Sequence, residues 1–219
     1  MKISYKHLVE HLKNKPDIND LSEKLFQLGH EHEILGDVIN LELTPNRGDC
    51  LSIKGLLRDL NLFYEINEVT NLYEKDVDNL DFKFINNATD ACPKISFFKV
   101  EIESIPRKYK GELDSYFSDL DIKKNNFFTD ISNYLSYETG QPTHCYEAKK
   151  LESGLRLDYA DQKQGFETLL GETIEIAEGD LVFLNNKDEI VNLAGIMGGS
   201  STSCKKNTKT VIVECAYFN

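Results

Sequence analysis

The chain has 219 residues, of which 40% are hydrophobic and 28% charged, so it is long enough to bury the core of one large or two small globular domains. Its formal net charge of −12 argues against non-specific binding of nucleic acid through the phosphates, which requires a basic surface. Because the sequence has neither an apolar stretch of membrane-spanning length nor the apolar core of a secretory signal, we expect a cytoplasmic protein with no membrane partner.

The first 80 residues predict a small, mostly helical domain. After a short N-terminal strand and helix, residues 17–33 carry apolar side chains at helical spacing, and Gly29 is typical of the position that follows a helix. Residues 37–44 alternate like a strand and lead into the polar turn PNRGD, after which helical spacing resumes over residues 50–66. Residues 65–80 are rich in Asn, Asp and Glu, which predicts a linker.

From residue 81 onward the pattern changes to short apolar runs separated by Gly, Asn and Asp turns, which predict strands. Helical spacing recurs over residues 110–120 and again over residues 127–140, where Gly140 ends the segment. We therefore predict an α/β (α+β) chain, with a small, mostly helical domain at residues 1–80 and a layered β/α domain at residues 81–219.

The segment TGQPTHCYE, residues 139–147, combines a turn with an imidazole, a thiol and a carboxylate. His144 follows a Gly-Gln-Pro turn just past a predicted helix, a place where side chains are presented rather than buried. A histidine in such a place can act as a general acid or base, but a single histidine is more often a hydrogen-bonded structural residue. Taken alone, the segment leaves both roles open.

Two features of the predicted second domain are typical of ligand binding. AGIMGG, residues 194–199, has three glycines that can expose backbone N–H groups to a ligand, although a bulge or hairpin turn has the same pattern. Glu214 lies in the apolar strand VIVECAYF, so its carboxylate is expected to be partly buried and to need a partner, either a ligand or a backbone N–H group. Together with His144, these features suit the binding or hydrolysis of a small polar ligand.

Other candidate sites are weaker. GHEHE, residues 29–33, places His30 and His32 on one face of a strand, but the sequence identifies no third ligand, so a solvated edge is favoured and we predict no metal site. The five cysteines are scattered and never form a CxxC pair, which favours reduced thiols. Arg47 in the PNRGD turn can bind a phosphate or brace the turn. The sequence contains no ATP-binding signature, serine nucleophile elbow or HExxH motif.

Four motifs become more informative when they are read together. LELTPNRGDCLSIKGLLRDL, NNFFTDISNYLSYETGQPTHCYEAKKL, LAGIMGG and VIVECAYFN follow one another along the chain. In this order they resemble the N-terminal part of the beta subunit of bacterial phenylalanyl-tRNA synthetase (phenylalanine–tRNA ligase), whose patterns are close to PNRxDCLS, DxTNYV…ELGQPxHAFD, LAGVMGG and EVACFDP. The resemblance spans roughly the whole chain. It implies a small N-terminal domain and a tRNA-editing domain, which hydrolyses tyrosine wrongly attached to phenylalanine tRNA.

The same resemblance implies roles for particular residues. It gives catalytic roles to His144, which would position a water molecule or the terminal ribose, and to Ser132, where the family usually has threonine. The substrate-binding residues that it implies are Glu214, Ala194, Gly195 and Pro142. An apolar pocket discriminates against an added hydroxyl group by only about a hundredfold, whereas a second site can demand that group by hydrogen bonding. The resemblance assigns the reading of the tyrosine hydroxyl to Glu214.

The family also implies partners. Its ligase active site, with ATP and Mg²⁺, lies in the alpha subunit, so we expect no cofactor in this chain and no aminoacyl bond formed by it alone. The expected partners are phenylalanine tRNA mischarged with tyrosine and, for a full beta subunit, an alpha subunit in an alpha2beta2 assembly.

The sequence also departs from the family pattern. EHEILGDVINLEL passes directly through the point where the family carries an inserted oligonucleotide-binding fold, the family continues beyond ECAYFN, and HCYE replaces HAFD. We therefore interpret the chain as an N-terminal fragment that carries the editing site. The alternative is a non-catalytic assembly or tRNA-docking scaffold with the editing fold.

Overall fold

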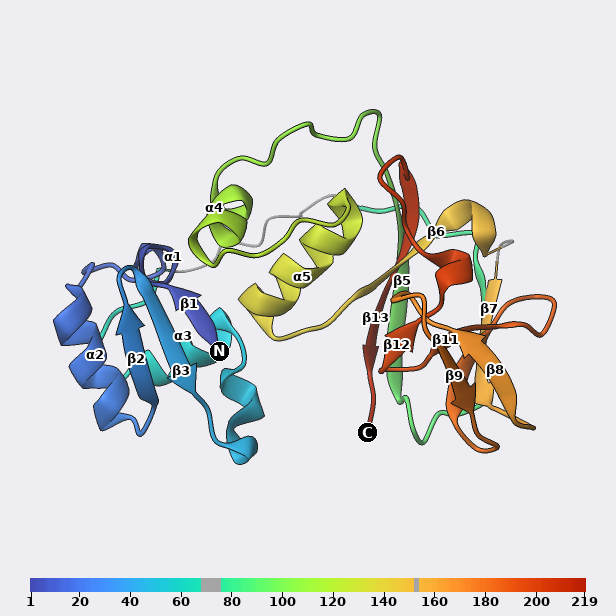
Figure 1. Cartoon of the computed structure of the whole chain (residues 1–219), viewed down its shortest axis with the longest axis horizontal. Helices are drawn as coiled ribbons and strands as arrows, with labels where there is room; N and C mark the ends of the chain where they lie inside the picture. The colour runs from blue at the N-terminus through green and yellow to red at the C-terminus, as the bar shows by residue number, and fades with distance from the viewer. Residues whose placement is uncertain (68–75, 152–153) are drawn as a thin grey trace. The chain divides into compact units, whose positions relative to one another are not determined.

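The computed structural model describes residues 1–67, 76–151 and 154–219, which form two compact units (Figure 1). The first unit consists of Met1–Asp76, Pro106–Lys124 and Asn133–Gln141, and the second of Val77–Ile105, Asn125–Ser132 and Pro142–Asn219. Because each unit is assembled from three segments of the chain, the division into residues 1–80 and 81–219 stays a prediction. The predicted linker lies in part, at residues 68–75, outside the described residues.

The first unit combines helices with a small antiparallel sheet. Its elements are β1 (Lys2–Ser4), α1 (Tyr5–Glu10), α2 (Ile18–Gln27), β2 (Glu31–Leu35), β3 (Val38–Glu42), the 3-10 helix η1 (Pro45–Cys50), α3 (Ile53–Leu60) and α4 (Glu112–Asp119). The strands pair in the order β1–β3–β2. The prediction of a mixed α and β chain is confirmed, but a mostly helical N-terminal domain is not, because β2 and β3 form a hairpin.

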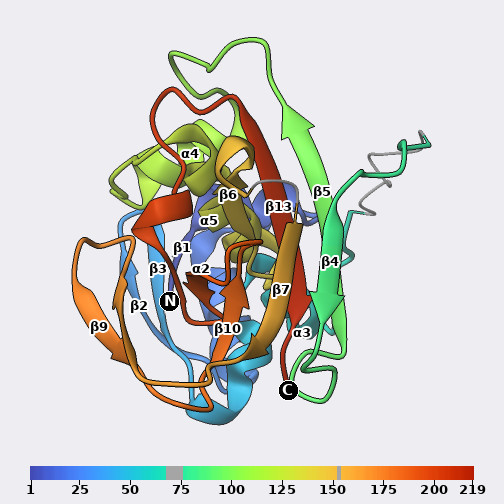
Figure 2. The same cartoon turned by 90° about the vertical axis from the view of Figure 1, so that its right-hand side faces the viewer.

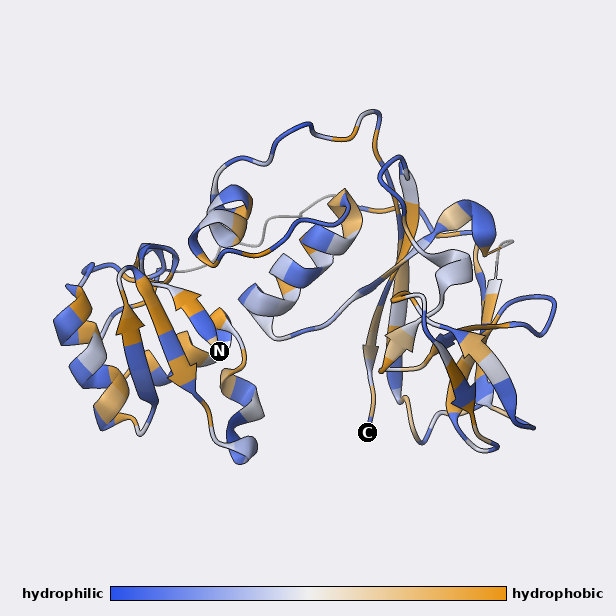
Figure 3. Cartoon of the chain, in the orientation of Figure 1, coloured by the Kyte–Doolittle hydropathy of each residue, from blue (hydrophilic) through white to orange (hydrophobic). Residues whose placement is uncertain are grey.

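Helix α2 shows how the local sequence determines an element of this unit. The Asp17 carboxylate caps the helix by accepting hydrogen bonds from the backbone N–H groups of Asn19 and Asp20, at 2.9 and 3.0 Å. Leu21 and Leu25, one turn apart, are fully buried, whereas most of the remaining helix is hydrophilic (Figure 3). The helix therefore contributes one apolar face to a core that it shares with β3 and α3.

The second unit is built mainly from strands. Its elements are β4 (Lys83–Asn86), β5 (Lys94–Glu101), β6 (His144–Glu147), the 3-10 helix η2 (Ala148–Lys150), β7 (Gly154–Tyr159), β8 (Gln164–Glu167), β9 (Thr173–Ile176), β10 (Leu181–Leu184), β11 (Ile190–Leu193), β12 (Met197–Gly198), the 3-10 helix η3 (Ser200–Thr202) and β13 (Thr210–Tyr217). Helix α5 (Phe127–Thr139) begins in a segment of this unit and ends in a segment of the first. None of the described helices is both long and apolar enough to cross a membrane.

The strands of the second unit form three sheets (Figure 2). Their orders are β12–β11–β10–β7–β4, β5–β13–β6 and β8–β9. The two larger sheets share one hydrophobic core, in which Tyr146, Leu157 and Phe183 are fully buried. Since this core contains side chains from both sheets, β6 and β13 direct part of their residues toward β10 and β11.

Candidate functional site

His144 and Glu214 lie opposite each other on neighbouring strands. Strand β6 pairs antiparallel with β13, and the register places His144 directly opposite Glu214. Residues in such a position project to the same face of a sheet, with Cβ atoms about 5 Å apart. The structure therefore brings together the two ionisable residues that the sequence singled out, although 69 positions separate them along the chain.

A buried hydrogen-bond network surrounds the Glu214 carboxylate. The Tyr146 hydroxyl donates to Glu214 Oε2 at 2.6 Å, and Asn192 Nδ2 donates to the Tyr146 hydroxyl at 2.9 Å. Tyr146 is completely buried and Glu214 is only 5% exposed. The carboxylate thus has a side-chain partner, the phenolic hydroxyl of Tyr146. A buried network of this kind fixes the orientation of its members.

Burial changes the protonation of both ionisable groups. It raises the pKa of Glu214 from 4.5 to about 7, against the smaller lowering effect of the Tyr146 hydroxyl, which donates to the carboxylate. It lowers the pKa of His144 from 6.5 to about 4. At neutral pH, His144 is therefore a neutral imidazole, and Glu214 is close to the midpoint of its titration.

The raised pKa of Glu214 predicts how stability depends on pH. Between pH 4.5 and about 7, the folded chain keeps a proton that the unfolded chain has released, so this group destabilises the fold as the pH rises. Glu214→Gln removes the titration, so the free energy of unfolding of the parent should fall relative to that variant by about 3 kcal/mol between pH 4.5 and pH 8. Urea unfolding of both proteins at these pH values measures the change. A difference that does not vary with pH would contradict the burial of a protonated Glu214 side chain.

The imidazole of His144 is enclosed but not fully hydrogen-bonded. Its ring packs edge-on against Tyr146, with centroids 4.4 Å apart and an angle of 73° between the planes. Its Nε2 atom is buried and has no hydrogen-bond partner within the described part of the chain. A buried nitrogen without a partner is costly, and such atoms are rare outside sites that bind water or a ligand. Nε2 is therefore the atom of His144 that still has the capacity to make a hydrogen bond.

The glycine-rich run forms the hairpin that joins β11 to β12. Asn192 is opposite Gly198 in this hairpin, and Gly195 in the turn has a φ of +71°, which favours glycine. The backbone N–H of Ala194 donates to the carbonyl of Leu181 at 2.9 Å, so it is used within the fold. The hairpin turn, one of the two alternatives left open by the sequence, is thus the observed structure.

Gly198 gives this hairpin a direct relation to His144. A Cβ atom on Gly198 would lie 2.3 Å from His144 Cε1 and 2.9 Å from His144 Nε2. Only a residue without a side chain allows the backbone of β12 to lie this close to the imidazole. The hairpin therefore supplies both Asn192, which binds Tyr146, and the glycine that covers His144.

The remaining predicted site residues lie on the connection that precedes β6. The Ser132 hydroxyl, on α5, donates to the Thr143 carbonyl at 2.5 Å and lies 2.8 Å from Thr143 Oγ1. Ser132 thus holds the residue that precedes His144. Pro142 is exposed in the same connection. The roles of Ser132 and Pro142 in catalysis and substrate binding stay predictions.

Sequence reasoning missed Tyr146 and Asn192, and it noted Gly198 only as one of the three glycines of AGIMGG. Tyr146 follows His144 by two positions, and residues so spaced on a strand share a face, so this tyrosine could have been found. Asn192 reaches the site, and Gly198 reaches His144, through the pairing of distant strands, which no local pattern in the sequence indicates.

The two histidines of GHEHE and Arg47 of the PNRGD turn contact other residues of the first unit. His32 Nδ1 contacts the His30 carbonyl at 2.8 Å and its Nε2 contacts Ser22 Oγ at 2.7 Å, whereas His30 Nε2 lies 3.1 Å from an oxygen of Asp59. The two imidazoles therefore contact different groups. Arg47 contacts the same Asp59 carboxylate at 2.5 Å, so it braces the PNRGD turn.

Comparisons with known proteins identify the family. Residues 98–219 match the B3/4 domain family. The chain is similar to the phenylalanine–tRNA ligase beta subunit of Aquifex aeolicus, with 32% identity over 86% of this chain and 24% of that protein. It is also similar to the same subunit of Psychrobacter arcticus, with 28% identity over 88% of this chain and 24% of that protein. The chain thus spans about a quarter of the length of these relatives.

A solved structure shares the fold. It is the crystal structure of an N-terminal fragment of the phenylalanyl-tRNA synthetase beta subunit from Pyrococcus horikoshii, with a TM-score of 0.51 and 12% identity over all of this chain and 68% of that one. At this identity the likeness concerns the fold alone. Since the family match covers more than half of the residues, and the resemblance seen in the motifs is confirmed by the relatives, the chain belongs to the B3/4 domain family and is related to the N-terminal part of phenylalanine–tRNA ligase beta subunits.

Proposed function

We propose that this chain carries an editing site that hydrolyses the ester of tyrosine wrongly attached to phenylalanine tRNA. One observation carries the proposal: the Glu214 carboxylate accepts a hydrogen bond from a phenol, the Tyr146 hydroxyl, at 2.6 Å. A phenolic hydroxyl is the only group that distinguishes tyrosine from phenylalanine. A buried carboxylate that binds this group is therefore suited to recognise the tyrosyl ester.

The energetics of a buried carboxylate favour selection for tyrosine. A hydrogen bond to a charged group contributes about 1.5–3 kcal/mol, and a ligand that lacks the hydroxyl leaves a buried oxygen without a partner. Phenylalanine would therefore bind more weakly than tyrosine, which is the reverse of the preference of an apolar synthetic pocket. In this proposal the tyrosine hydroxyl contacts the Glu214 carboxylate beside, or in place of, Tyr146.

His144 is the proposed catalytic residue. Its neutral imidazole is on the same face as Glu214, and its Nε2 has no hydrogen-bond partner among the described residues. An aminoacyl ester is already reactive, so orienting a water molecule and stabilising the developing oxyanion is sufficient. Ser132 is proposed as a positioning residue that acts through Thr143. Ala194, Gly195 and Pro142 are proposed to line the substrate.

The wider context of the reaction is part of the same proposal. As part of a beta subunit, the chain would act beside an alpha subunit that carries out ATP- and Mg²⁺-dependent aminoacylation in an alpha2beta2 assembly. Hydrolysis of the ester needs only water, so the proposed reaction requires no cofactor in this chain.

Two observations favour a second candidate, a non-catalytic scaffold. Tyr146 already donates to one oxygen of Glu214, and the backbone at Gly198 lies against the His144 ring. If these contacts persist when tRNA binds, the fold would serve assembly or tRNA docking. The two candidates differ in whether the chain hydrolyses the ester.

Removal of the imidazole tests the proposed catalytic role. We expect His144→Ala to lower the rate of tyrosyl-tRNA(Phe) deacylation about 100-fold or more, since a positioned histidine contributes about 10²–10⁴. Loss of radiolabelled tyrosine from the tRNA measures the rate. The matched control is His32→Ala, which removes an imidazole that contacts Ser22 and should leave the rate unchanged. Equal rates for the parent and His144→Ala would assign the hydrolysis to another group.

A further inference from the structure

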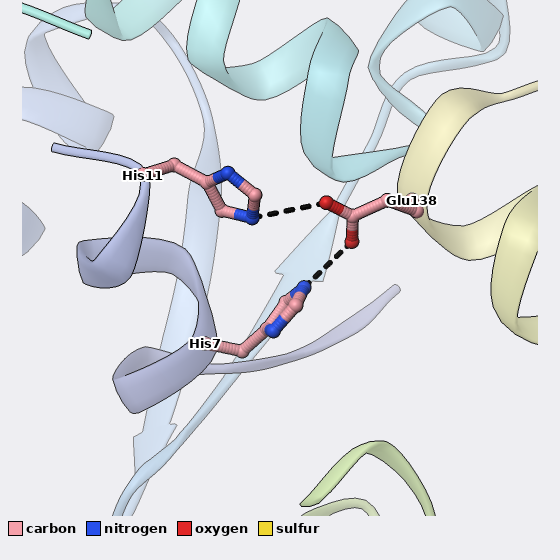
Figure 4. Close-up of side chains that lie close together, drawn as sticks. All are labelled: His7, His11 and Glu138. Atoms are coloured by element: carbon pink, nitrogen blue, oxygen red, sulfur yellow. Dashed lines mark hydrogen bonds and ion pairs between the residues drawn. The ribbon is translucent and has the colours of Figure 1, made fainter. Parts of the chain in front are cut away.

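Two histidines and a carboxylate meet in the first unit, outside the proposed editing site (Figure 4). His7 lies on α1 and His11 directly follows that helix, four positions later. Both Nε2 atoms face Glu138, near the end of α5: His7 Nε2 is 2.6 Å from Oε2, and His11 Nε2 is 2.9 Å from Oε1. Glu138 is more than 120 positions from the two histidines along the chain, and the three side chains converge on one point.

The surroundings of this cluster are largely closed to solvent. The side chains of His7, His11 and Glu138 are 3%, 17% and 19% exposed, respectively. The rings of Tyr134 and Tyr137 pack against His7, with centroid distances of 6.0 and 5.8 Å. Charged and polar groups in such surroundings interact strongly and need partners of matching chemistry.

Hydrogen bonds within the cluster do not satisfy every buried polar atom of His7, His11 and Glu138. His11 Nε2 is buried and, although close to Glu138, makes no well-aligned hydrogen bond with any described residue. Glu138 forms ion pairs with the two histidines, and in the described part of the chain no lysine or arginine joins them. The cluster therefore combines a carboxylate with two imidazoles, one of which lies 2.9 Å from that carboxylate without a well-aligned hydrogen bond.

The set of donor atoms is that of a zinc ligand sphere. Histidines four positions apart present both imidazoles on one side of a helix, the arrangement of known zinc sites, and a carboxylate supplies the third ligand. The donor atoms of His7, His11 and Glu138 all lie within 4.8 Å of one another. Ligand atoms around tetrahedral Zn²⁺ are about 3.3 Å apart, given bonds of about 2.0 Å, so small shifts suffice.

A second cluster in the same unit provides a contrast. His30, Cys50 and Asp59 are also within ligand distance of one another. There, however, the Arg47 guanidinium contacts both Asp59 at 2.5 Å and the Cys50 sulfur at 2.7 Å. A guanidinium cation thus already contacts two of the three candidate ligands, so this cluster is not suited to a metal ion.

We propose that His7, His11 and Glu138 bind one Zn²⁺ ion through three protein ligands, with a further position open to water. Two imidazole nitrogens favour a borderline ion such as Zn²⁺ over Mg²⁺ or Ca²⁺, which prefer oxygen ligands. The ion connects the N-terminal helix with the end of α5 within the first unit. This site departs from the expectation, drawn from the sequence, that the chain has no metal site.

Metal titration of the full chain tests the proposal. After dialysis against a chelator, calorimetric titration with Zn²⁺ should give one site per chain and raise the melting temperature. Glu138→Gln keeps the shape of the side chain but removes its charge, and it should weaken Zn²⁺ binding at least tenfold. The matched control His32→Gln should bind like the parent. Equal affinity for Zn²⁺ in Glu138→Gln and the parent would overturn the proposal.

A spectroscopic readout on the parent chain avoids dependence on the folding of the variants. Co²⁺ bound by two imidazoles and a carboxylate gives visible absorption without the thiolate-to-metal charge-transfer bands of cysteine ligation. Co²⁺ bands of the first kind, which Zn²⁺ displaces, support the site. Charge-transfer bands would place the ion at the cysteines, and failure to bind either ion stoichiometrically would exclude the site; both results overturn the proposal.

Discussion

Glu214→Gln should lower the selectivity of deacylation for tyrosyl- over phenylalanyl-tRNA(Phe) by about 10- to 100-fold, the equivalent of about 1.5–3 kcal/mol. The amide keeps the shape of the side chain but loses the negative charge that strengthens a hydrogen bond from a phenol. Because burial raises the pKa of Glu214 to about 7, selectivity of the parent should also increase as the pH rises through 7. The rate constants for both esters, measured at pH 6 and pH 8, give the two effects.

Tyr146→Phe is the matched control for this substitution. It removes the hydroxyl that donates to Glu214 but leaves the carboxylate in place. We expect this variant to keep its preference for the tyrosyl ester, although it is less stable because the amide of Asn192 loses its partner. If Glu214→Gln discriminates between the esters as well as the parent does, Glu214 is not the residue that recognises the hydroxyl.

Gly198→Ala should impair both stability and editing. The added methyl group would lie 2.3 Å from His144 Cε1 and 2.9 Å from Leu169 Cδ1, closer than atoms can approach without displacement. The imidazole packs against Tyr146, so its displacement strains the core at a cost of about 1–3 kcal/mol. A displacement of about 1 Å can lower a catalytic rate about 100-fold. Urea unfolding and tyrosyl-tRNA deacylation measure the two losses.

Gly165→Ala separates this effect from the general cost of replacing a glycine. Its Cβ would make an ordinary contact of 3.5 Å with Thr173, on a strand of the same unit, and should leave the deacylation rate unchanged. If Gly198→Ala matched Gly165→Ala in stability and rate, the close approach of β12 to His144 would have no functional importance.

The sequence correctly predicted the features that depend on residues close together along the chain. Helix α2 has an acidic cap, leucines four positions apart and a terminal glycine, and each of these is a local property. Glu214 stands among apolar neighbours in a strand, so its burial was also predictable. Both predictions rest on residues that lie close together along the chain.

Strand β2 shows why the N-terminal part was predicted to be more helical than it is. Most of its side chains are exposed, and within the sheet it pairs with β3 alone. An edge strand of this kind needs no alternation of apolar and polar residues, so GHEHEIL gave no periodic pattern to detect. The hairpin is determined by pairing with β3, which is a tertiary interaction.

The candidate site was also predictable only in part, because its geometry depends on how distant strands pair. Motifs at residues 139–147 and 194–199 drew attention to His144 and to the glycine-rich hairpin. The register that sets His144 opposite Glu214, and the contact of Asn192 with Tyr146, depend on how distant strands pair. Single-sequence patterns do not contain this information, because they describe neighbours along the chain rather than across a sheet.

The most direct test of the proposed function compares the first-order rate constants for deacylation of tyrosyl-tRNA(Phe) and phenylalanyl-tRNA(Phe), each with and without the chain. The proposed function predicts that the chain accelerates loss of tyrosine at least tenfold more than loss of phenylalanine. If neither ester is hydrolysed faster than in buffer, even with the alpha subunit and the remaining beta-subunit domains supplied, the editing proposal is contradicted and the scaffold interpretation takes its place.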